Sequence, residues 1–231
     1  MNLMDIHRIR IGAPPLACLR PLVMGLADSP AVEFIKSPVQ ELKDQFAQGV
    51  MDAALLPPFV ALEQPGCRVI PGICLAAEQE TGCARINSSV PLDRLSSLRA
   101  DSGAEHLREW AIVLDLPLAS DQESCDAVLV HDAPPCSAET HPYHYDLGVM
   151  WRERTDLPMV LFIWVCRSRA PYPQLRRILA QAQQEGMAEE AGAASYFHYR
   201  MASQEADSLR RLATLSIQHG LCPPDASIIY C

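Results

Sequence analysis

The feature of the sequence that most limits its possible folds is the succession of a strand, a helix and a strand near the N-terminus. Residues 9–12 alternate in polarity and end at a glycine before a proline pair, as a strand entering a loop does. Residues 39–49 carry apolar side chains at helical spacing and end at a glycine. Residues 51–56 form an apolar run long enough only for a buried strand. This order predicts a βαβ unit in an α/β fold.

Two of the predicted helices begin with a serine in a capping pattern. Ser37 precedes Pro38 and Gln40, and Ser102 precedes Glu105 by three positions. A serine hydroxyl at this place accepts a hydrogen bond from a free backbone amide, and the glutamine or glutamate completes a capping box. We therefore expect Ser37 and Ser102 to cap their helices.

The rest of the chain continues the alternation and then changes character. Residues 126–130 and 158–165 are apolar runs typical of strands, and residues 145–154 between them are predicted to be a short helix. Beyond residue 167 the pattern predicts helices only, at residues 172–185, at about 189–200, and from residue 203 to Gly220.

Composition and charge exclude several classes of protein. A hydrophobic fraction of 49% supplies a packed core, and the formal net charge of -9 argues against a nucleic-acid partner, which needs a surplus of Lys and Arg. Residues 1–12 carry charges where a signal peptide would be apolar, and no later run is long enough to span a membrane. We therefore expect a cytoplasmic protein without nucleic-acid or membrane partners, and no feature indicates an oligomeric state.

The nine cysteines do not follow a metal-binding pattern. They are scattered without a C-x-x-C pair and are predicted to be reduced, mostly buried thiols. Residues able to bind a metal gather at His131, Asp132, Cys136, His141 and His144. Prolines interrupt this segment and its spacing is not that of a metalloprotease, so we predict no metal site.

Cys18 is the thiol with the clearest potential for reactivity. It lies in the loop after the first predicted strand, beside Arg20, and a nearby cation lowers a thiol pKa. The alternative is a small residue that packs under the loop. A Gly-x-Ser-x-Gly elbow and a Gly-rich phosphate loop are both missing from the sequence, which therefore gives no support to a serine hydrolase or a nucleotide cofactor.

Several motifs together resemble one enzyme family. Residues 145–151 read Tyr-Asp-Leu-Gly-Val-Met-Trp, and they are followed by Thr-Asp-Leu-Pro at 155–158 and Phe-Ile-Trp-Val at 162–165. In order and spacing these segments resemble the signature of the chorismate dehydratases of the futalosine route to menaquinone. Residues 21–26 resemble the family's N-terminal Pro-Leu-x-x-Gly-Leu, and residues 130–133 occupy the place of its Gly-Asp-Ala-Leu-like turn.

The resemblance implies a fold, a reaction and a ligand. The fold is like that of type 2 periplasmic binding proteins, in which two α/β lobes enclose a ligand between them. Residues 1–83 with the helical tail 168–231 would form the first lobe, and residues 84–167 the second. The implied activity is that of a lyase that removes water from chorismate to give 3-(1-carboxyvinyloxy)benzoate, with a small carboxylate as its ligand and no metal or organic cofactor.

Some positions depart from the family's pattern. Cys18 stands where the family has an asparagine, and a serine expected after Gly82 aligns with Cys83 or with Ser88. The family's Ser-x-Thr-Ser turn falls on residues 101–104, where a carboxylate and an alanine replace hydroxyl donors. A carboxylate at a helix N-terminus competes for the amides that would bind an anionic substrate.

These observations give a set of candidate site residues and three functional hypotheses. The expected catalytic residues are Cys18 and Ser88, and the expected substrate-binding residues are Arg20, Asp101, Ser102, Gly103 and Asp132. The first hypothesis is a divergent chorismate dehydratase. The second is an inactive or reassigned carboxylate-binding protein on the same scaffold, and the third is an enzyme with Cys18 as nucleophile. All need residues 12–21, 101–105 and 131–133 to converge on one enclosed space.

Overall fold

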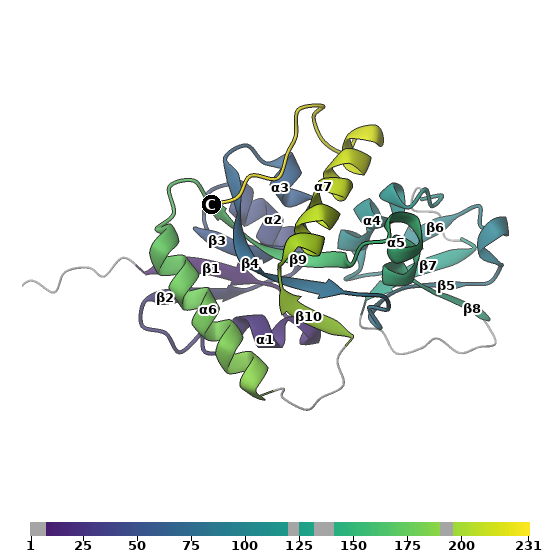
Figure 1. Cartoon of the computed structure of the whole chain (residues 1–231). Coiled ribbons are helices and arrows are strands. Elements are labelled where there is room, and N and C mark those ends of the chain that lie inside the picture. The colour runs from purple at the N-terminus through teal and green to yellow at the C-terminus, as the bar shows by residue number, and fades with distance from the viewer. Residues whose placement is uncertain (1–7, 120–124, 132–140, 190–195) are drawn as a thin grey trace, which may run out of the picture.

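The strands of the computed structural model, which describes residues 8–119, 125–131, 141–189 and 196–231, form two separate sheets (Figure 1). The larger sheet has the order β10-β4-β9-β3-β1-β2. Its strands are β1 (Ile9–Ala13), β2 (Val32–Lys36), β3 (Ala53–Leu56), β4 (Cys67–Ala77), β9 (Met159–Arg167) and β10 (Phe197–Arg200). The smaller sheet has the order β6-β7-β5-β8 and consists of β5 (Ala84–Ser88), β6 (Leu98–Ala100), β7 (Ala127–His131) and β8 (Tyr143–Asp146).

The predicted βαβ unit is confirmed. β1 pairs in parallel with β3, and α2 (Val39–Ala47) precedes β3 in the chain and packs against both strands. The sequence reading missed β2, which pairs in parallel with the other edge of β1. A parallel sheet buries its central strands on both faces, and all four residues of β3 are buried.

The longest contact between strands joins β4 and β9, which run antiparallel in the middle of the larger sheet. β9 confirms the predicted buried strand, since all of its residues except the last are buried. β4 was missed because Pro71 and Gly72 lie within it and normally interrupt a strand. The pairing tolerates them because the register shifts between Val69 and Cys74, where Gly72 adopts a positive φ of 90°.

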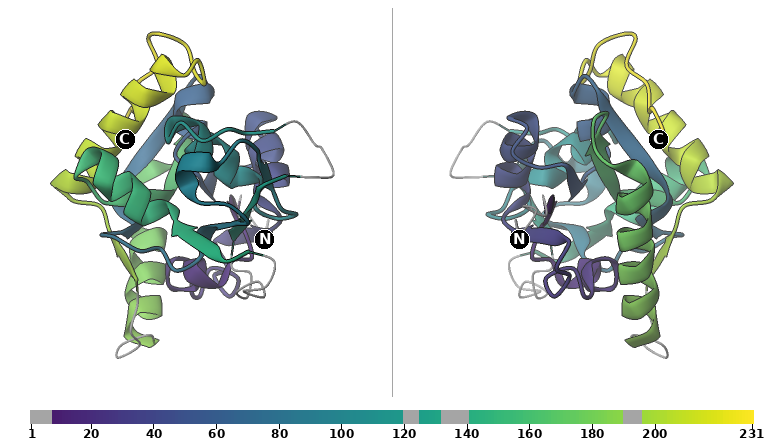
Figure 2. Two further views of the ribbon diagram at one scale, coloured as in Figure 1. Left: turned by 90° about the vertical axis from the view of Figure 1, so that its right-hand side faces the viewer. Right: turned by 90° about the vertical axis from the view of Figure 1, so that its left-hand side faces the viewer.

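Helices cover both faces of the larger sheet. Figure 1 shows α1 (Arg20–Val23) and α6 (Tyr172–Glu189) on one side, with α2, α3 (Val60–Glu63) and α7 (Ser203–Gln218) on the other. The two views of Figure 2 place α7 at the flank of the molecule opposite to α2. α4 (Arg108–Val113) and α5 (Leu147–Thr155) accompany the smaller sheet. None of the described helices combines the length and the apolar composition that crossing a bilayer requires.

The capping predictions are wrong at both serines. Ser37 donates its hydroxyl to the Glu41 carboxylate, and the residue before α2 is Pro38, without a side-chain cap. Ser102 is exposed and precedes the helical turn, which begins only at η3 (Glu105–Leu107). There the Glu105 carboxylate accepts a hydrogen bond from the Gly103 amide. In both places a glutamate side chain forms the local hydrogen bond instead of a serine cap on the helix. Sequence spacing alone does not distinguish these two arrangements.

Two predicted helices also differ from the structure. The segment 145–154 starts with the end of β8, and α5 begins at Leu147 because the Asp146 side chain accepts a hydrogen bond from the Gly148 amide. The predicted helix at about 189–200 is wrong at its end, where β10 pairs with β4. The prediction of helices only beyond residue 167 is therefore wrong as well, whereas α6 and α7 are confirmed.

One hydrophobic core runs through both sheets. Phe59 beside α3 packs edge-on against Trp110 of α4 at 5.2 Å between ring centroids, and Trp110 packs in the same way against Trp151 of α5 at 5.2 Å. All the strands between residues 84 and 146 lie in the smaller sheet, while β9 lies in the larger one. The division into lobes at residues 84 and 167 stays a proposal.

Candidate functional site

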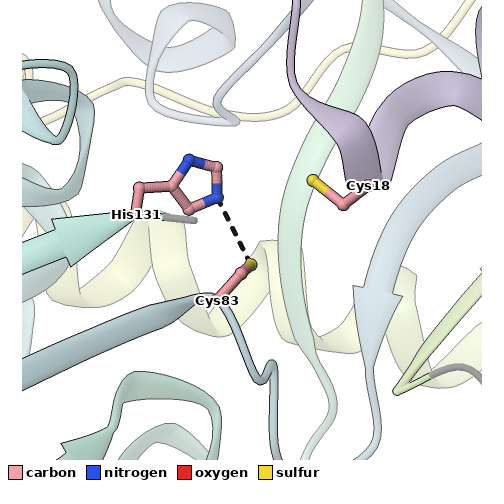
Figure 3. A group of neighbouring side chains, drawn as sticks. All are labelled: Cys18, Cys83 and His131. Carbon is pink, nitrogen blue, oxygen red and sulfur yellow. Dashed lines mark hydrogen bonds between the residues drawn. The ribbon is translucent and has the colours of Figure 1, made fainter. Parts of the chain in front are cut away.

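A thiol pair and an imidazole meet where the two sheets approach each other (Figure 3). Cys18 lies in η1 (Ala17–Leu19) after β1, Cys83 directly precedes β5, and His131 ends β7. β5 and β7 run antiparallel with Ala84 opposite His131, so Cys83 and His131 lie at the same end of the smaller sheet. The Cys83 Sγ lies 3.3 Å from the His131 Nε2, and the Cys18 side chain points toward both.

The environment of Cys83 keeps its thiol protonated. The neighbouring Cys18 thiol and burial raise the pKa of Cys83 above its ordinary value, and they outweigh the His131 imidazole, which acts in the opposite direction. A neutral thiol is a poor nucleophile. Cys83 therefore does not have the character of an activated cysteine.

His106 forms the wall between this cluster and a cavity. Its ring lies edge-on to the His131 ring at 4.8 Å between centroids and tilted against Phe162 at 5.7 Å. Burial, reinforced by His131, lowers the pKa of His106 to about 3, so its imidazole is neutral at pH 7. Among the described residues, neither the Nε2 of His106 nor the Nδ1 of His131 has a hydrogen-bond partner, although both atoms are buried.

The cavity has a volume of about 240 Å³ and is lined mostly by apolar groups. Its walls come from the loop after β1, the start of α2 and the turn before α4, with the lining residues Pro14, Pro15, Leu16, Pro38, Val39, Gln40, Gly103, Glu105 and His106. A neighbouring hollow of about 640 Å³ shares part of this lining and adds Ser102, Arg108 and Glu109. None of the described residues that line the smaller cavity is a lysine or an arginine.

The three segments that the sequence predicted to converge do lie together in their described parts. Residues 14–16 line the cavity together with Gly103, Glu105 and His106, and the His106 ring packs edge-on against His131. Asp132 lies outside the described residues. Among the described residues that line this cavity, the ionisable side chains are Glu105 and His106.

The other predicted site residues lie in different places. Arg20 is exposed and forms an ion pair with Glu189 at 3.1 Å. Ser88 ends β5 at the opposite end from Cys83, and its hydroxyl donates to the Val90 carbonyl oxygen at 2.7 Å. Asp101 is exposed, whereas Ser102 lines the larger hollow and Gly103 lines both cavities. Gly103 therefore lines the cavity and Cys18 belongs to the cluster with Cys83 and His131, whereas Arg20 and Ser88 lie at neither.

Sequence reasoning gave no role to His106 and left Cys83 as one of two alignments. Cys83 and His131 are 48 positions apart, so no local spacing pattern joins them. The sequence feature that could have joined them is their place next to strands, since Cys83 directly precedes one strand and His131 ends another. Pairing of these strands brings the two residues together, but the sequence reading did not predict β5.

Comparison with known proteins gives a family and a fold. A family model described as menaquinone biosynthesis matches residues 85–219, more than half of the chain. Protein AF1704 from Archaeoglobus fulgidus has a similar structure, with a TM-score of 0.66, 13% identity, and coverage of 93% of this chain and 98% of that one.

Two sulfonate-binding proteins are also similar in structure. The alkanesulfonate-binding protein SsuA from Xanthomonas axonopodis pv. citri, bound to MOPS, matches with a TM-score of 0.56, 12% identity and coverage of 94% of both chains. The periplasmic aliphatic sulphonate binding protein SsuA from Escherichia coli matches with a TM-score of 0.57, 12% identity, and coverage of 96% of this chain and 95% of that one. At such identities the likeness shows the fold alone, and it confirms the expected fold of the periplasmic binding proteins.

Proposed function

The chain belongs to the menaquinone biosynthesis family, that of the chorismate dehydratases, and on this basis we propose that it is a lyase that removes water from chorismate. The product would be 3-(1-carboxyvinyloxy)benzoate, as in the futalosine route. The observation that carries the proposal is the cavity between the loop after β1 and the turn before α4, because an imidazole without a described hydrogen-bond partner on its Nε2 forms part of its wall.

The reaction needs few groups. A hydrogen leaves the ring carbon that carries the enolpyruvyl ether, the hydroxyl leaves the neighbouring carbon, and the two depart together as water. The electron pair of the broken C–H bond enters the ring, which becomes aromatic and so supplies much of the driving force. One base that takes the proton and returns it to the departing hydroxide satisfies the balance.

We assign the proton acceptor to His106. Its low pKa makes it a weak base in the free protein. A carboxylate of the substrate bound beside it favours the imidazolium form and raises its pKa on binding. The dry, largely apolar wall strengthens this effect because a low dielectric increases the interaction between the charges. His106 would therefore gain basicity when the substrate is in place.

The other candidate residues have less direct roles in this proposal. Gly103 contributes backbone to the lining of the cavity. Cys18 lies two positions beyond the lining residue Leu16 and is not itself among the described lining residues. The proposal assigns no step to Ser88, whose hydroxyl bonds to the backbone at the opposite end of β5.

The lack of a cationic side chain among the described lining residues favours a second candidate function. A dianion enters an uncharged or negative cavity at a cost in desolvation that only directed donors offset. Glu105 lines the cavity without a lysine or arginine among the other described lining residues. This supports a binding protein on the same scaffold that recognises a less charged small molecule and performs no reaction.

Incubation of the purified protein with chorismate separates the two candidates. We expect loss of the diene absorbance together with an aromatic product of the mass expected for loss of water. His106→Phe, which keeps a ring in the stack, is expected to reduce the rate at least about 100-fold, the scale of general acid–base catalysis. Gln40→Ala changes the lining without removing a base and serves as the matched control.

The absence of an aromatic product would contradict the proposed dehydration. If no product forms at high protein concentration, the dehydratase proposal fails. Melting temperatures with and without chorismate then show whether the compound binds, because a ligand that binds only the folded state raises the melting temperature. We further propose that the protein acts in the cytoplasm on this small carboxylate, without nucleic-acid or membrane partners, and this is supported by its biosynthetic family and its net charge of -9.

A further inference from the structure

We propose that Cys18, Cys83 and His131 form a binding site for zinc, which ties the loop after β1 to the ends of β5 and β7. The inference does not rest on the dehydration of chorismate, because metal binding is measured on the protein alone. It also departs from the prediction of no metal site that the spacing of the residues in the sequence gave.

The positions of the three donor atoms fit one metal ion. A tetrahedral zinc with bonds of about 2.3 Å to sulfur and about 2.0 Å to nitrogen separates a sulfur and a nitrogen ligand by roughly 3.5 Å, and two sulfur ligands by roughly 3.8 Å. The Cys83 Sγ and the His131 Nε2 are 3.3 Å apart, and all three donor atoms lie within 4.8 Å of one another. Small side-chain movements therefore complete the triangle.

The donor set is selective. Two thiolates and one imidazole are soft and borderline ligands that favour zinc over magnesium or calcium, which prefer oxygen. Cys18 and His131 are partly exposed and Cys83 is buried, so the site combines access for the ion with exclusion of bulk water. Three protein ligands leave the fourth tetrahedral position open, an arrangement found in sites where zinc also binds water or a substrate.

The departures from the family's pattern support the same reading. Cys18 stands at the position where the family resemblance implies an asparagine, and Cys83 is one of the two residues that align with an expected serine. At Cys18 a thiol takes the place of a neutral amide donor. Cys18 in η1 and Cys83 before β5 are 65 positions apart in the chain, yet both thiols lie close to the same imidazole.

A second group of ligand-capable residues provides an internal comparison. Glu78, His198 and Glu205 also bring their ligand atoms within 4.8 Å of one another. This group has no sulfur, and Glu78 is exposed. Metal bound there would differ from metal at the thiol site in its spectrum, so the two sites are distinguishable in one experiment.

The test uses the full chain, reduced with a phosphine and freed of metal, and titrated with Co²⁺ alone and with Zn²⁺ alone. We expect one equivalent of Co²⁺ to produce thiolate-to-cobalt charge-transfer absorption, and Zn²⁺ to displace it. X-ray absorption at the zinc edge should then give two sulfur neighbours at about 2.3 Å and at least one nitrogen at about 2.0 Å. This measurement on the unaltered protein does not depend on whether any variant folds.

Variants assign the ligands. Cys18→Ser, Cys83→Ser and His131→Asn are each expected to weaken Zn²⁺ binding more than about 100-fold, beyond the usual effect of a residue that only orients a ligand. Cys222→Ser removes a cysteine elsewhere in the chain, and His198→Asn removes a ligand of the oxygen-rich group. Both control variants should bind Zn²⁺ as the unaltered protein does, and circular dichroism verifies that each variant is folded.

Two results would overturn the proposal. One is a folded, reduced protein in which bound Co²⁺ gives no thiolate charge-transfer absorption or does not bind at all. The other is a charge-transfer signal that survives Cys83→Ser but disappears in Cys222→Ser, which would place the thiolate site elsewhere in the chain.

Discussion

At the scale of single residues, burial of His106 links the stability of the fold to pH. Its side chain is buried between His131 and Phe162, and the burial lowers its pKa to about 3. In the unfolded chain the same group titrates near 6.5. Between these values the unfolded state binds more protons than the folded state, so the stability linked to neutral His106 is complete above pH 6.5 and is lost as the pH falls.

This linkage predicts the effect of removing the imidazole. Between pH 7.5 and pH 5 the protonation of His106 in the unfolded state costs the protein about 2 kcal/mol of unfolding free energy. The unfolding free energy of His106→Phe should therefore fall by about 2 kcal/mol less than that of the unaltered protein between pH 7.5 and pH 5. Urea denaturation at both pH values measures this difference. His219→Phe, at a more exposed position, is the control. Equal slopes for His106→Phe and the unaltered protein would contradict the assignment.

Lys43 forms ion pairs with carboxylates of two other helices. It reaches from α2 to Glu109 of α4 at 2.9 Å and to Glu63 of α3 at 3.6 Å. Burial disfavours its charge, yet the two carboxylates outweigh that cost and raise its pKa. The ammonium group thus holds together helices that accompany different sheets.

Removal of that ammonium group should leave two carboxylates close together without a cation. We expect Lys43→Met to destabilise the fold by about 1–3 kcal/mol, less than a fully buried pair because the side chains remain 16–31% exposed. Lys36→Met, at an exposed position at the end of β2, should change stability by less than about 0.5 kcal/mol. Chemical denaturation of both variants at pH 7.5 makes the comparison.

At the scale of elements, the packing of α6 on α1 depends on one glycine. Gly186 is buried on the face of α6 toward α1, and a Cβ built there would overlap the backbone of Pro21. A glycine within a helix costs about 1 kcal/mol relative to alanine. The close approach of the two backbones explains why this cost is accepted, and it fixes where α1 lies on the larger sheet.

Gly186→Ala tests that packing. Helix propensity alone predicts stabilisation, whereas the overlap with Pro21 predicts a loss of about 1–3 kcal/mol, and we expect the overlap to dominate. Gln184→Ala changes an exposed position on the same helix and should be nearly neutral. A more stable Gly186→Ala variant, measured by thermal melting against this control, would show that α1 and α6 are not in close contact.

At the scale of the whole molecule, the two sheets share one core. The aromatic chain from Phe59 through Trp110 to Trp151 crosses from the larger sheet to the smaller one. The Trp151 indole donates hydrogen bonds to the Pro158 carbonyl oxygen and to the Ser208 hydroxyl of α7, which packs on β9. The sheets are therefore coupled by buried contacts, and the cavity lies beside a shared core.

This coupling predicts cooperative unfolding. Far-ultraviolet circular dichroism, which follows all elements, and tryptophan fluorescence, which follows the aromatic chain, should give coincident transitions. Trp110→Phe should lower the midpoint of both signals together, with a cost of about 1–3 kcal/mol for the smaller ring. Two separated transitions would mean that the sheets unfold independently.

Local sequence patterns predict the elements in which a single periodicity or motif dominates. The parallel pair of β1 and β3, the buried strand β9, the helices α6 and α7 and the family signature at residues 145–165 all follow from periodicity or local motifs. These patterns are local consequences of burying apolar side chains at a fixed repeat. The convergence of the loop after β1 with the turn before α4 also follows, because the resemblance implied which segments line the cleft.

The positions of the candidate site residues relative to one another depend on long-range contacts in the folded chain. β4 accommodates Pro71 and Gly72 by a shift of register against β9, which no local pattern contains. β5 and β7 bring Cys83, directly before β5, next to His131 at the end of β7, and the fold then adds Cys18 from η1 and His106 from the turn before α4. Such contacts depend on the pairing of strands far apart in the chain, and the free energy of that pairing is spread over the whole core.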